Sequence, residues 1–187
     1  MSKNRCGWCL GDELYEAYHD QEWGVPVKDD ETLFEFLLLE SFQAGLSWIT
    51  ILKKRENFKE AFDHFNYQKI ATYDEAKKEE LKQNASIIRN KLKISATIGN
   101  AQAFMKVQEE FGSFSHYIWG FVGHRPIKNR VKYYKDAPAT TEISDLISKD
   151  LKKRGFKFVG STIVYAFMQA TGMVNDHETD CFRYNEV

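Results

Sequence analysis

An all-α fold is predicted for this chain by two observations. Apolar residues recur at a helical period near 3.6 through most of the sequence, and the alternation typical of β-strands is nearly absent. The 187 residues include only 3 Pro and 11 Gly, too few for a many-turned all-β architecture. A hydrophobic fraction of 43% and a charged fraction of 28% are typical of a soluble globular protein. The length fits one domain, so we expect residues 1–187 to form a single unit.

Five helices are expected in the first part of the chain, most of them from apolar residues in helical register and 74–83 as a charged helical stretch. Asp12, Asp29, Asp30 and Ser47 stand where a side chain can accept hydrogen bonds from the free N–H groups of a helix start. Gly112 ends the last of these helices. The expected ranges are 12–22, 31–44, 48–62, 74–83 and 86–111.

The second part of the chain is expected to hold a long loop between helical regions. An aromatic-rich segment covers 113–122, and 123–141 contains two of the three prolines, which predicts a loop. A helix over 141–154, a tight connection over 155–160 and an apolar helix over 161–172 follow. The sequence shows no internal repeat and no low-complexity tract.

A membrane location is not indicated. No segment reaches the roughly 18 uninterrupted apolar residues that a membrane span needs. The polar start of the chain lacks the apolar stretch of a secretory signal, so we expect a cytoplasmic protein. The cysteines, Cys6, Cys9 and Cys181, are odd in number. An odd count is a poor disulfide framework and favours metal binding or free thiols.

Candidate zinc ligands stand at both ends of the chain. Cys6 and His19 lie near the N-terminus, and His177 and Cys181 form a His-x3-Cys pair near the C-terminus. Thiolates and imidazoles are good zinc ligands, and four of them make a closed structural site that would tie the two ends together. Cys9 competes with Cys6, because a C-x2-C pair is typical of a zinc site or of a redox motif. Spacing alone leaves both cysteines open, together with the reading that these residues hold no metal.

A carboxylate among aromatic residues predicts a pocket for a flat cation. Glu40 directly follows an apolar run, so we expect it at the edge of a core, where burial raises the pKa of a carboxyl group. Tyr and Trp faces bind flat heterocycles and attract cations, which suits an alkylated base. Rings that merely fill the core, and a capping or ion-pair role for Glu40, are the alternatives. The aromatic residues concerned are Trp8, Tyr15, Tyr18, Trp23 and Trp48.

The net charge of -1 argues against a nucleic-acid partner only if the charge is uniform, and it is not. Residues 12–40 hold ten acids and one base, whereas residues 121–135 hold five bases and no acid. Residues 149–157 hold five bases and one acid, and Lys53 to Arg55 add a further cluster. A phosphate backbone responds to such local patches rather than to the sum over the chain.

The connection 155–160 adds a second indication of phosphate binding. Helix, glycine-bearing turn and helix in succession can present backbone N–H groups to a phosphate, here followed by Ser161 and Thr162. A solvated lysine face with a glycine helix cap is the alternative interpretation.

Several stretches across nearly the whole chain combine into a specific pattern. They are Cys6-Gly-Trp8, Tyr15-x2-Tyr18-His-Asp-x-Glu-Trp-Gly-Val-Pro26, Leu39-Glu40, Gln43-Ala-Gly-Leu-Ser-Trp-Ile-Thr50, Leu52-Lys-Lys-Arg-Glu-Asn57, Leu151-Lys-Lys-Arg-Gly-Phe-Lys-Phe-Val-Gly160 and Val174-Asn-Asp-His177. In this combination the chain resembles the type I 3-methyladenine DNA glycosylase family.

The resemblance implies an all-α helix–hairpin–helix glycosylase with a structural Zn²⁺. The implied zinc ligands are Cys6, His19, His177 and Cys181, which leaves Cys9 as a free thiol. The implied regions are zinc-tied ends over 1–25 and 173–187, a helical core and pocket over 26–122, and a DNA-facing hairpin region over 123–172.

The resemblance also implies an activity, namely excision of 3-methyladenine from alkylated double-stranded DNA with free 3-methyladenine as product. Thr162 stands about where bifunctional relatives carry a Schiff-base lysine, so we expect an abasic site and no strand cleavage. Asp176 precedes the implied ligand His177, and we expect it either to have a structural role or to support the metal site. We further expect a monomer.

Individual roles follow from the same resemblance. Glu40 would contact the edge of the excised base, and Tyr18 and Trp48 would stack on it. The other implied site residues are Trp8, Tyr15 and Trp23 in the pocket wall, Gln43, Gly45 and Leu46 at the gap left in the DNA, and Lys157, Gly160, Ser161 and Thr162 at the DNA backbone. A thiol enzyme using Cys6 and Cys9, and a module that binds alkylated DNA without chemistry, are the other functional classes.

Overall fold

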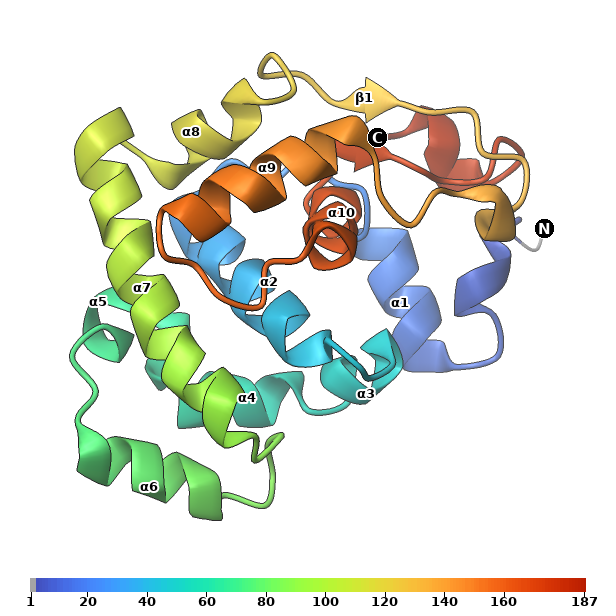
Figure 1. Ribbon diagram of the computed structural model, residues 1–187. Helices are drawn as coiled ribbons and strands as arrows, with labels where there is room; N and C mark the ends of the chain where they lie inside the picture. The colour runs from blue at the N-terminus through green and yellow to red at the C-terminus, as the bar shows by residue number, and fades with distance from the viewer. Residues whose placement is uncertain (1–2) are drawn as a thin grey trace.

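The computed structural model describes residues 3–187 and consists mostly of helices (Figure 1). The strands within these residues, β1 and β2, have only two residues each, so the expected helical class is confirmed. In chain order, with η for a 3-10 helix, the elements are η1 (Gly7–Cys9), α1 (Glu13–Gln21), α2 (Asp30–Gln43), α3 (Trp48–Leu52), α4 (Arg55–Ala61), η2 (Asp63–Phe65), α5 (Tyr67–Ile70), α6 (Glu75–Gln83), α7 (Lys91–Phe111), α8 (Phe114–Gly120), β1 (Ile127–Lys128), η3 (Tyr134–Asp136), α9 (Glu142–Lys153), α10 (Ser161–Ala170), β2 (Val174–Asn175) and η4 (Phe182–Asn185).

Short acidic side chains set several helix starts, as the sequence predicts. Asp12 caps α1 by accepting from two backbone N–H groups of its first turn, and Asp29 caps α2 by accepting from the N–H group of Thr32. Asp30, predicted as a second cap of α2, is the first residue of that helix. Its carboxylate instead accepts from the N–H groups of Phe114 and Ser115, at 2.9 and 2.7 Å. Asp30 therefore ties α2 to the start of α8.

The helix predicted over 48–62 is in fact two helices. α3 ends at Leu52 and α4 begins at Arg55, although apolar residues keep a helical spacing across the break. Ser47 is the N-cap residue of α3 as predicted, but its hydroxyl bonds the hydroxyl of Thr50 at 2.6 Å rather than a backbone N–H group. Periodicity alone does not reveal such an interruption.

Two further boundaries differ from the prediction. The helix predicted from residue 86 starts only at Lys91, because Asn90 accepts two backbone N–H groups and so caps α7. The loop predicted over 123–141 contains β1 and η3, and β1 pairs in parallel with β2 near the C-terminus. A strand of two residues is too short to show the alternation of apolar and polar residues by which strands are predicted.

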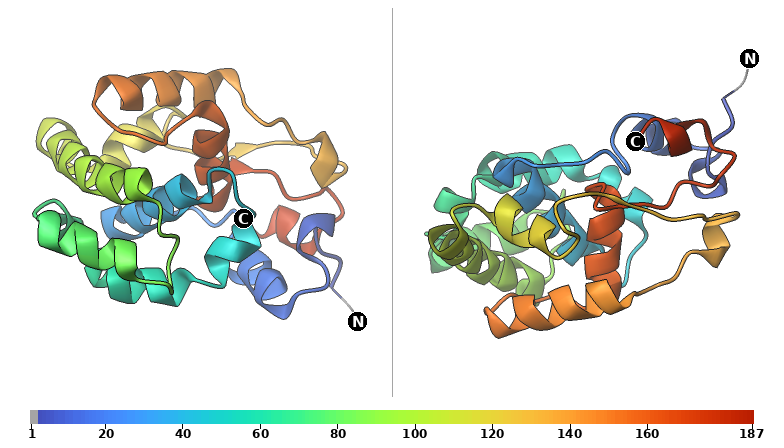
Figure 2. Two further views of the ribbon diagram at one scale, coloured as in Figure 1. Left: turned by 60° about the horizontal axis from the view of Figure 1, so that its bottom comes forward. Right: turned by 90° about the horizontal axis from the view of Figure 1, so that it is seen from above.

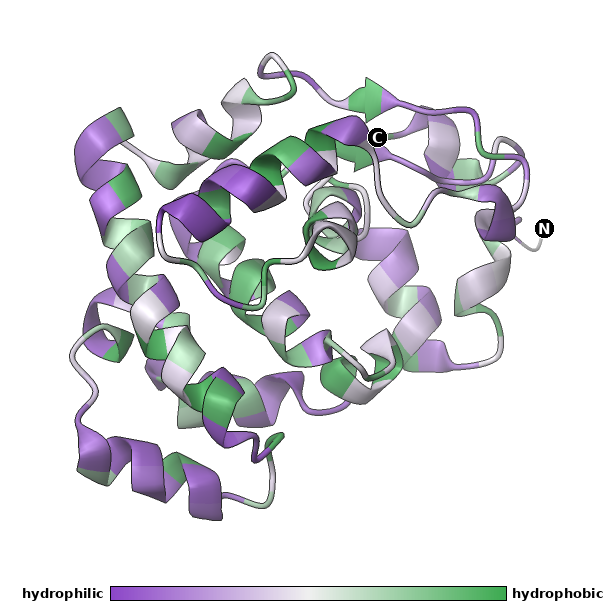
Figure 3. Cartoon of the chain, viewed as in Figure 1, coloured by the Kyte–Doolittle hydropathy of each residue, from purple (hydrophilic) through white to green (hydrophobic). Residues whose placement is uncertain are grey.

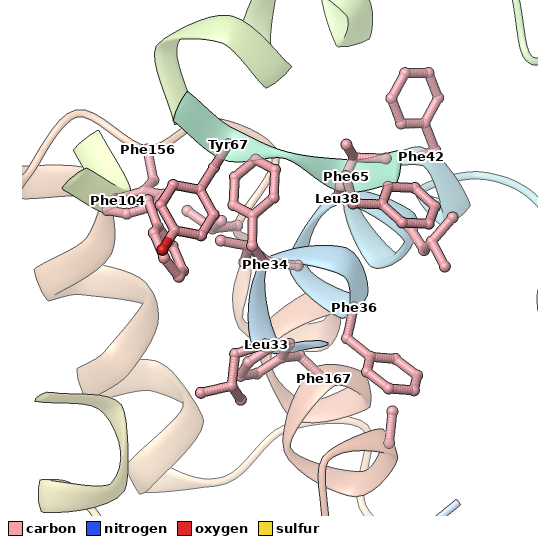
Figure 4. Close-up of a cluster of buried hydrophobic side chains, with 14 of the residues drawn as sticks. Leu33, Phe34, Phe36, Leu38, Phe42, Phe65, Tyr67, Phe104, Phe156 and Phe167 are labelled. Carbon is pink, nitrogen blue, oxygen red and sulfur yellow. The ribbon is translucent and has the colours of Figure 1, made fainter. Parts of the chain in front are cut away.

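The core is organised around α2, which is buried on nearly all sides from Leu33 to Phe42. A helix that is apolar all round belongs inside a protein. Phe34 packs edge-on against Phe104 of α7 and Tyr67 of α5, with ring centroids 5.2 and 5.6 Å apart (Figure 4). α6, by contrast, is hydrophilic along most of its length (Figure 3). α2 therefore carries its C-terminal residues, including Glu40, from the core to the functional site.

The N-terminal segment around η1 and the C-terminal segment around η4 lie side by side (Figure 2). The N–H group of Phe182 donates to the carbonyl of Asn4 at 2.9 Å, and the N–H group of Gly7 donates to the carboxylate of Glu178 at 3.2 Å. These contacts place the first and last candidate metal ligands in one region. No helix within residues 3–187 is long and apolar enough to cross a membrane.

Candidate functional site

A cavity of about 300 Å³ opens where α1, α2, α3 and α10 converge. We call it the aromatic cavity. It contains the carboxylate and all five rings that the sequence analysis singled out, which come from four separate stretches of the chain. Its lining residues are Trp8, Tyr15, Tyr18, Trp23, Glu40, Gln43, Trp48, Tyr134, Ala137, Thr162, Ala166, Gln169 and Asp176.

Glu40 is the buried acid of this cavity, with 3% of its surface exposed. Burial raises the pKa of its carboxyl group to about 8 and is the one cause of the shift. No hydrogen bond or charge from the described residues offsets that cost, so the group is ready to receive a donor or a cation from outside the chain. The expected rise in pKa is confirmed.

Tyr18 and Trp48 stand next to each other in the cavity wall, with ring centroids 5.6 Å apart and planes inclined at 50°. Aromatic rings in direct contact have centroids about 4.5–7 Å apart, so no flat ring fits between these two as they stand. The Tyr18 hydroxyl and the Trp48 and Trp8 indole N–H groups are buried without a hydrogen-bond partner. Buried polar groups normally have a partner, and all three of these belong to residues that line the cavity, which suggests a ligand there as the missing partner.

Trp8 connects the remaining rings of the wall. Its ring packs edge-on against Tyr15 at 4.8 Å and Trp23 at 5.0 Å between centroids. It also contacts the imidazole of His19 at 5.5 Å, and Trp23 contacts the imidazole of His177 at 4.6 Å. The cavity wall therefore rests directly on two of the predicted metal ligands.

Three of those four predicted ligands form one cluster. The side-chain ligand atoms of Cys6, His19 and Cys181 all lie within 4.8 Å of one another and are buried. The Cys181 sulfur is 3.4 Å from Nε2 of His19. Two thiols and an imidazole are a typical zinc donor set. These residues therefore bring the two ends of the chain into contact, as predicted.

His177 lies beside this cluster, not within it. Its ring centroid is 5.1 Å from that of His19, and its Nε2 atom is buried without a hydrogen-bond partner. Burial lowers the pKa of its imidazole to about 3, so the ring is neutral and Nε2 carries a free lone pair. The orphaned nitrogen fits a fourth metal ligand.

The outer ring nitrogens of both histidines are held by polar side chains. Nδ1 of His19 bonds the carboxylate of Asp20 at 2.9 Å, and Arg5 in turn donates to that carboxylate. Nδ1 of His177 bonds the side-chain oxygen of Asn175 at 3.1 Å. Such partners fix the ring orientation and leave Nε2 to a metal. Asn175 is therefore the residue that supports the His177 ring, and Asp176 is not.

Cys9 stands apart from the candidate metal centre. Its thiol donates to the carbonyl of Cys6 at 3.2 Å, and burial raises the pKa of the thiol to about 12. A reactive cysteine needs an exposed thiol of low pKa. The geometry therefore opposes a redox function for the Cys6-Gly-Trp-Cys9 motif.

Gln43, Gly45 and Leu46 form a closed turn after α2. The N–H group of Leu46 donates to the carbonyl of Gln43 at 2.7 Å, and the Gln43 side-chain amide donates to the carbonyl of Leu46 at 2.6 Å. Gly45 has a φ of 81°, a conformation that glycine adopts at little cost. The turn holds the Leu46 side chain 37% exposed beside the cavity.

The residues predicted to bind the DNA backbone lie around the start of α10. Gly160 is the N-cap residue, and Ser161 begins the helix with its hydroxyl 2.8 Å from that of Ser144 on α9. Lys157 is exposed in the preceding turn. Thr162, expected at the DNA backbone, also lines the aromatic cavity. The helix start and the cavity mouth are therefore neighbours.

Of the two roles expected for Asp176, the contacts of its carboxylate fit the structural one. It lines the cavity and accepts hydrogen bonds from Tyr165 at 2.6 Å, Gln169 at 2.9 Å and Asn129 at 2.6 Å. Gln169, Tyr134, Ala137 and Ala166 also line the cavity and were not predicted. No motif marks them, because the fold brings them in from α10 and from the loop around η3.

The predicted basic clusters differ in how many of their side chains are paired with acidic residues of the protein. Arg55 is paired with Glu22 at 2.8 Å and Glu35 at 2.7 Å, and Lys53 is paired with Asp12 at 2.9 Å, so this cluster is occupied within the protein. In the cluster over 149–157, Arg154 pairs with acids, whereas the lysines make no salt bridge within the described residues.

Comparison with known proteins adds the family. A family model described as methyladenine glycosylase matches residues 8–184. The chain belongs to this family. It is therefore a glycosylase, as the resemblance implied. It is 51% identical over 180 residues to DNA-3-methyladenine glycosylase 1 of Escherichia coli (strain K12), covering 96% of each chain.

Solved structures agree with this assignment. A crystal structure of 3-methyladenine DNA glycosylase I matches with a TM-score of 0.93 and 50% identity, over 96% of this chain and 98% of that one. The 3-methyladenine DNA glycosylase I of Staphylococcus aureus, solved to explain its recognition of 3-methyladenine, matches with a TM-score of 0.93 and 36% identity over 97% of each chain. The helical fold is thus the fold of this family.

Proposed function

We propose that the protein excises 3-methyladenine from alkylated double-stranded DNA by hydrolysing the N-glycosidic bond. One observation carries the proposal: the aromatic cavity joins a buried, unbonded carboxyl group of Glu40 to three buried aromatic N–H and O–H groups without partners. Such a cavity suits a flat cation with hydrogen-bonding edges. The names of the relatives support the choice of base.

Access to the cavity requires the damaged nucleotide to leave the duplex, because its base cannot be reached inside the stack. Tyr18 and Trp48 then supply the stacking faces, each worth about 1–3 kcal/mol per base. Since their rings are now in contact, Trp48 on the short helix α3 is expected to turn when the base enters. Tyr15, Trp8 and Trp23 close the wall.

Glu40 provides selectivity for the methylated base. Methylation at N3 makes the adenine cationic and weakens its bond to the sugar. An ionised Glu40 accepts a hydrogen bond from the exocyclic amine and balances the positive charge, whereas neutral adenine gains less. The bond between C1′ and the base breaks with its electrons moving to the base. A water oxygen then bonds C1′ and releases a proton.

The reaction stops at an abasic site in this proposal. Strand cleavage by bifunctional glycosylases needs an amine that forms a Schiff base with the sugar. Thr162 lies at the cavity instead and has no amine. We therefore propose a monofunctional enzyme, acting as a monomer in the cytoplasm.

DNA is held by two neighbouring structures. Leu46, exposed on its closed turn, fills the gap left by the extruded nucleotide, positioned by Gln43 and Gly45. α9, the connection and α10 act as a helix–hairpin–helix. The N-terminal N–H groups at Gly160 and Ser161, with Lys157 nearby, bind a phosphate.

A structural Zn²⁺ is proposed at the candidate metal centre. Cys6, His19 and Cys181 would hold it with Nε2 of His177, the orphaned nitrogen beside them. The donor set is that of closed structural sites, which have no open position for a substrate. The ion would stabilise the contact between the chain's ends and the wall residues that rest on it.

The proposal is tested by incubating the purified protein with methylated duplex DNA and separating the products. Release of free 3-methyladenine with strands that break only after alkaline treatment of the abasic sites is expected. Tight binding without base release would favour the non-catalytic binding module. Strand cleavage without alkali would contradict the monofunctional mechanism.

A further inference from the structure

We propose that one face of α7, through Lys93 and Asn100, is a positioning device that holds the two DNA-facing turns in fixed relation. One turn is Gln43 to Leu46 after α2, and the other is the connection before α10. The inference rests on the proposed function, because these turns matter only if they bind DNA. It assigns a role to buried polar residues outside the aromatic cavity.

Lys93 is a buried lysine, 7% exposed, aimed at the end of α2. Its ammonium group donates to the carbonyl of Phe42 at 2.8 Å and to the carbonyl of Ala44 at 2.6 Å. The last carbonyls of a helix lack partners within the helix and carry its negative end, so a buried cation there is favourable. Lys93 therefore fixes the point at which the Leu46 turn departs from α2.

Asn100 lies about two helical turns further along α7 and holds the connection before α10 in place. Its side-chain amide donates to the carbonyl of Lys157 at 3.0 Å, and its side-chain oxygen accepts from the N–H group of Lys157 at 2.8 Å. These two hydrogen bonds satisfy both backbone groups of Lys157, which lies in a segment without helix or strand. Figure 1 shows the connection from α9 to α10 beside α7.

Two further contacts lie next to these anchors. Thr97, between them and also buried, donates its hydroxyl to the carbonyl of Lys93 at 2.9 Å. The ammonium group of Lys93 lies 6.0 Å from the ring centroid of Phe158, the neighbour of Lys157 in the connection. Phe158 has a φ of 57°, an unfavourable conformation for a non-glycine residue that needs support from its surroundings.

Burying a lysine and an asparagine costs free energy that their hydrogen bonds must offset, and hydrophobic side chains could fill the same space without that cost. Burial lowers the pKa of Lys93, which shows that the charged form is held at a cost. The contacts fix two loops at once, and neither residue lines the aromatic cavity. Their loss should therefore affect the binding of duplex DNA and spare the binding of the free base.

The test compares Lys93→Met with Lys106→Met, which removes a lysine from the exposed side of the same helix. Affinity is measured for a duplex with a tetrahydrofuran abasic-site analogue and, separately, for free 3-methyladenine. We expect Lys93→Met to bind the duplex about ten-fold more weakly with little change for the free base. Lys106→Met should bind both as the wild type does, and Lys93→Arg should restore most of the duplex affinity.

A double-mutant cycle with Leu46→Ala shows whether Lys93 acts through the turn. The two losses in duplex affinity should be less than additive, whereas a general structural defect gives additive losses. If Lys93→Met does not fold, Asn100→Asp decides, since it keeps the side-chain shape and the acceptor for the N–H group of Lys157 but replaces the donor to the Lys157 carbonyl with a carboxyl oxygen. Unchanged duplex affinity in the folded variants, or an equal loss for duplex and free base, would overturn the inference. A wild type that does not bind the duplex would instead refute the proposed function.

Discussion

The indole ring of Trp23 lies edge-on against the imidazole of His177, with ring centroids 4.6 Å apart and planes at 68°. One residue belongs to the cavity wall and the other to the candidate metal centre. Trp8 and His19 repeat the arrangement at 5.5 Å. The cavity for the base and the cluster that joins the chain's ends therefore share one layer of packed rings.

Loss of the proposed metal should consequently affect both stability and base binding. For Cys181→Ser we expect loss of bound zinc. The free energy of unfolding should fall by at least about 3 kcal/mol, which lowers the Tm by roughly 6–12 °C in a chain of this size. Affinity for free 3-methyladenine should fall as well, because Trp8 and Trp23 lose their support. Elemental analysis, thermal unfolding and base titration measure the three effects. Full zinc content in Cys181→Ser would rule out this ligand.

Gly24→Ala should disturb the same centre without removing a ligand. A Cβ atom on Gly24 would lie 2.6 Å from Cε1 of His177, and Gly24 has a φ of 80°. We expect weaker zinc retention and a lower Tm. Gly11→Ala is the matched control, because Gly11 has a φ of 91° and open space around its Cβ position. Equal effects of the two substitutions would show that backbone strain, not contact with His177, is responsible.

Excision should depend on the ionisation of Glu40. Burial raises its pKa to about 8, so the carboxyl group of the free protein is mostly protonated at neutral pH. Because the cationic base is bound best by the ionised form, kcat/KM should rise as the pH is raised from about 6.5 to about 8.5. In Glu40→Gln this rise should disappear along with most of the activity. A pH profile unaltered in shape by the substitution would refute the role.

The same shift predicts the pH dependence of stability. The pKa of Glu40 rises from its ordinary value of 4.5 to about 8 on folding. The contribution of the protonated carboxyl group to the free energy of unfolding is therefore fully present below pH 4.5 and is lost as the pH rises through about 8. Glu40→Gln carries no such cost. The stability of this variant relative to the wild type should therefore increase between acidic and alkaline pH, as urea unfolding at each pH can measure.

Leu46→Ala should separate DNA engagement from base recognition. The side chain is exposed on its turn, so its truncation should leave the Tm almost unchanged. Excision from duplex DNA should fall, while affinity for free 3-methyladenine should stay at the wild-type level. Fluorescence titration and single-turnover excision report the two quantities. An unimpaired excision rate would mean that Leu46 does not fill the gap in the DNA.

The parts of the fold that depend on local chemistry were predictable from the sequence. Capping by Asp12 and Asp29 follows from residue type and position, and the helical period located the central helix around Glu40. The break between α3 and α4 was not predictable, since apolar residues keep their spacing through it. A local turn leaves no mark on a hydrophobic pattern.

The site divides in the same way. Glu40 and Trp48 were recognisable as an acid and a ring suited to a flat cation, and the structure places both at one cavity. Gln169 and Asp176 reach that cavity only through the packing of α10 against the strand that follows it. Nothing in the sequence distinguishes Lys93 from the other lysines, because its burial against the end of α2 is a tertiary contact.

Base release by matched variants tests the central claim most directly. Wild type, Glu40→Gln and Glu31→Gln, an exposed residue of the same helix, are incubated with methylated duplex DNA under single-turnover conditions, and free 3-methyladenine is quantified. Rapid release by the wild type and by Glu31→Gln, with release by Glu40→Gln reduced by about a hundred-fold or more, is the predicted result. Release by folded Glu40→Gln at the wild-type rate would contradict the account.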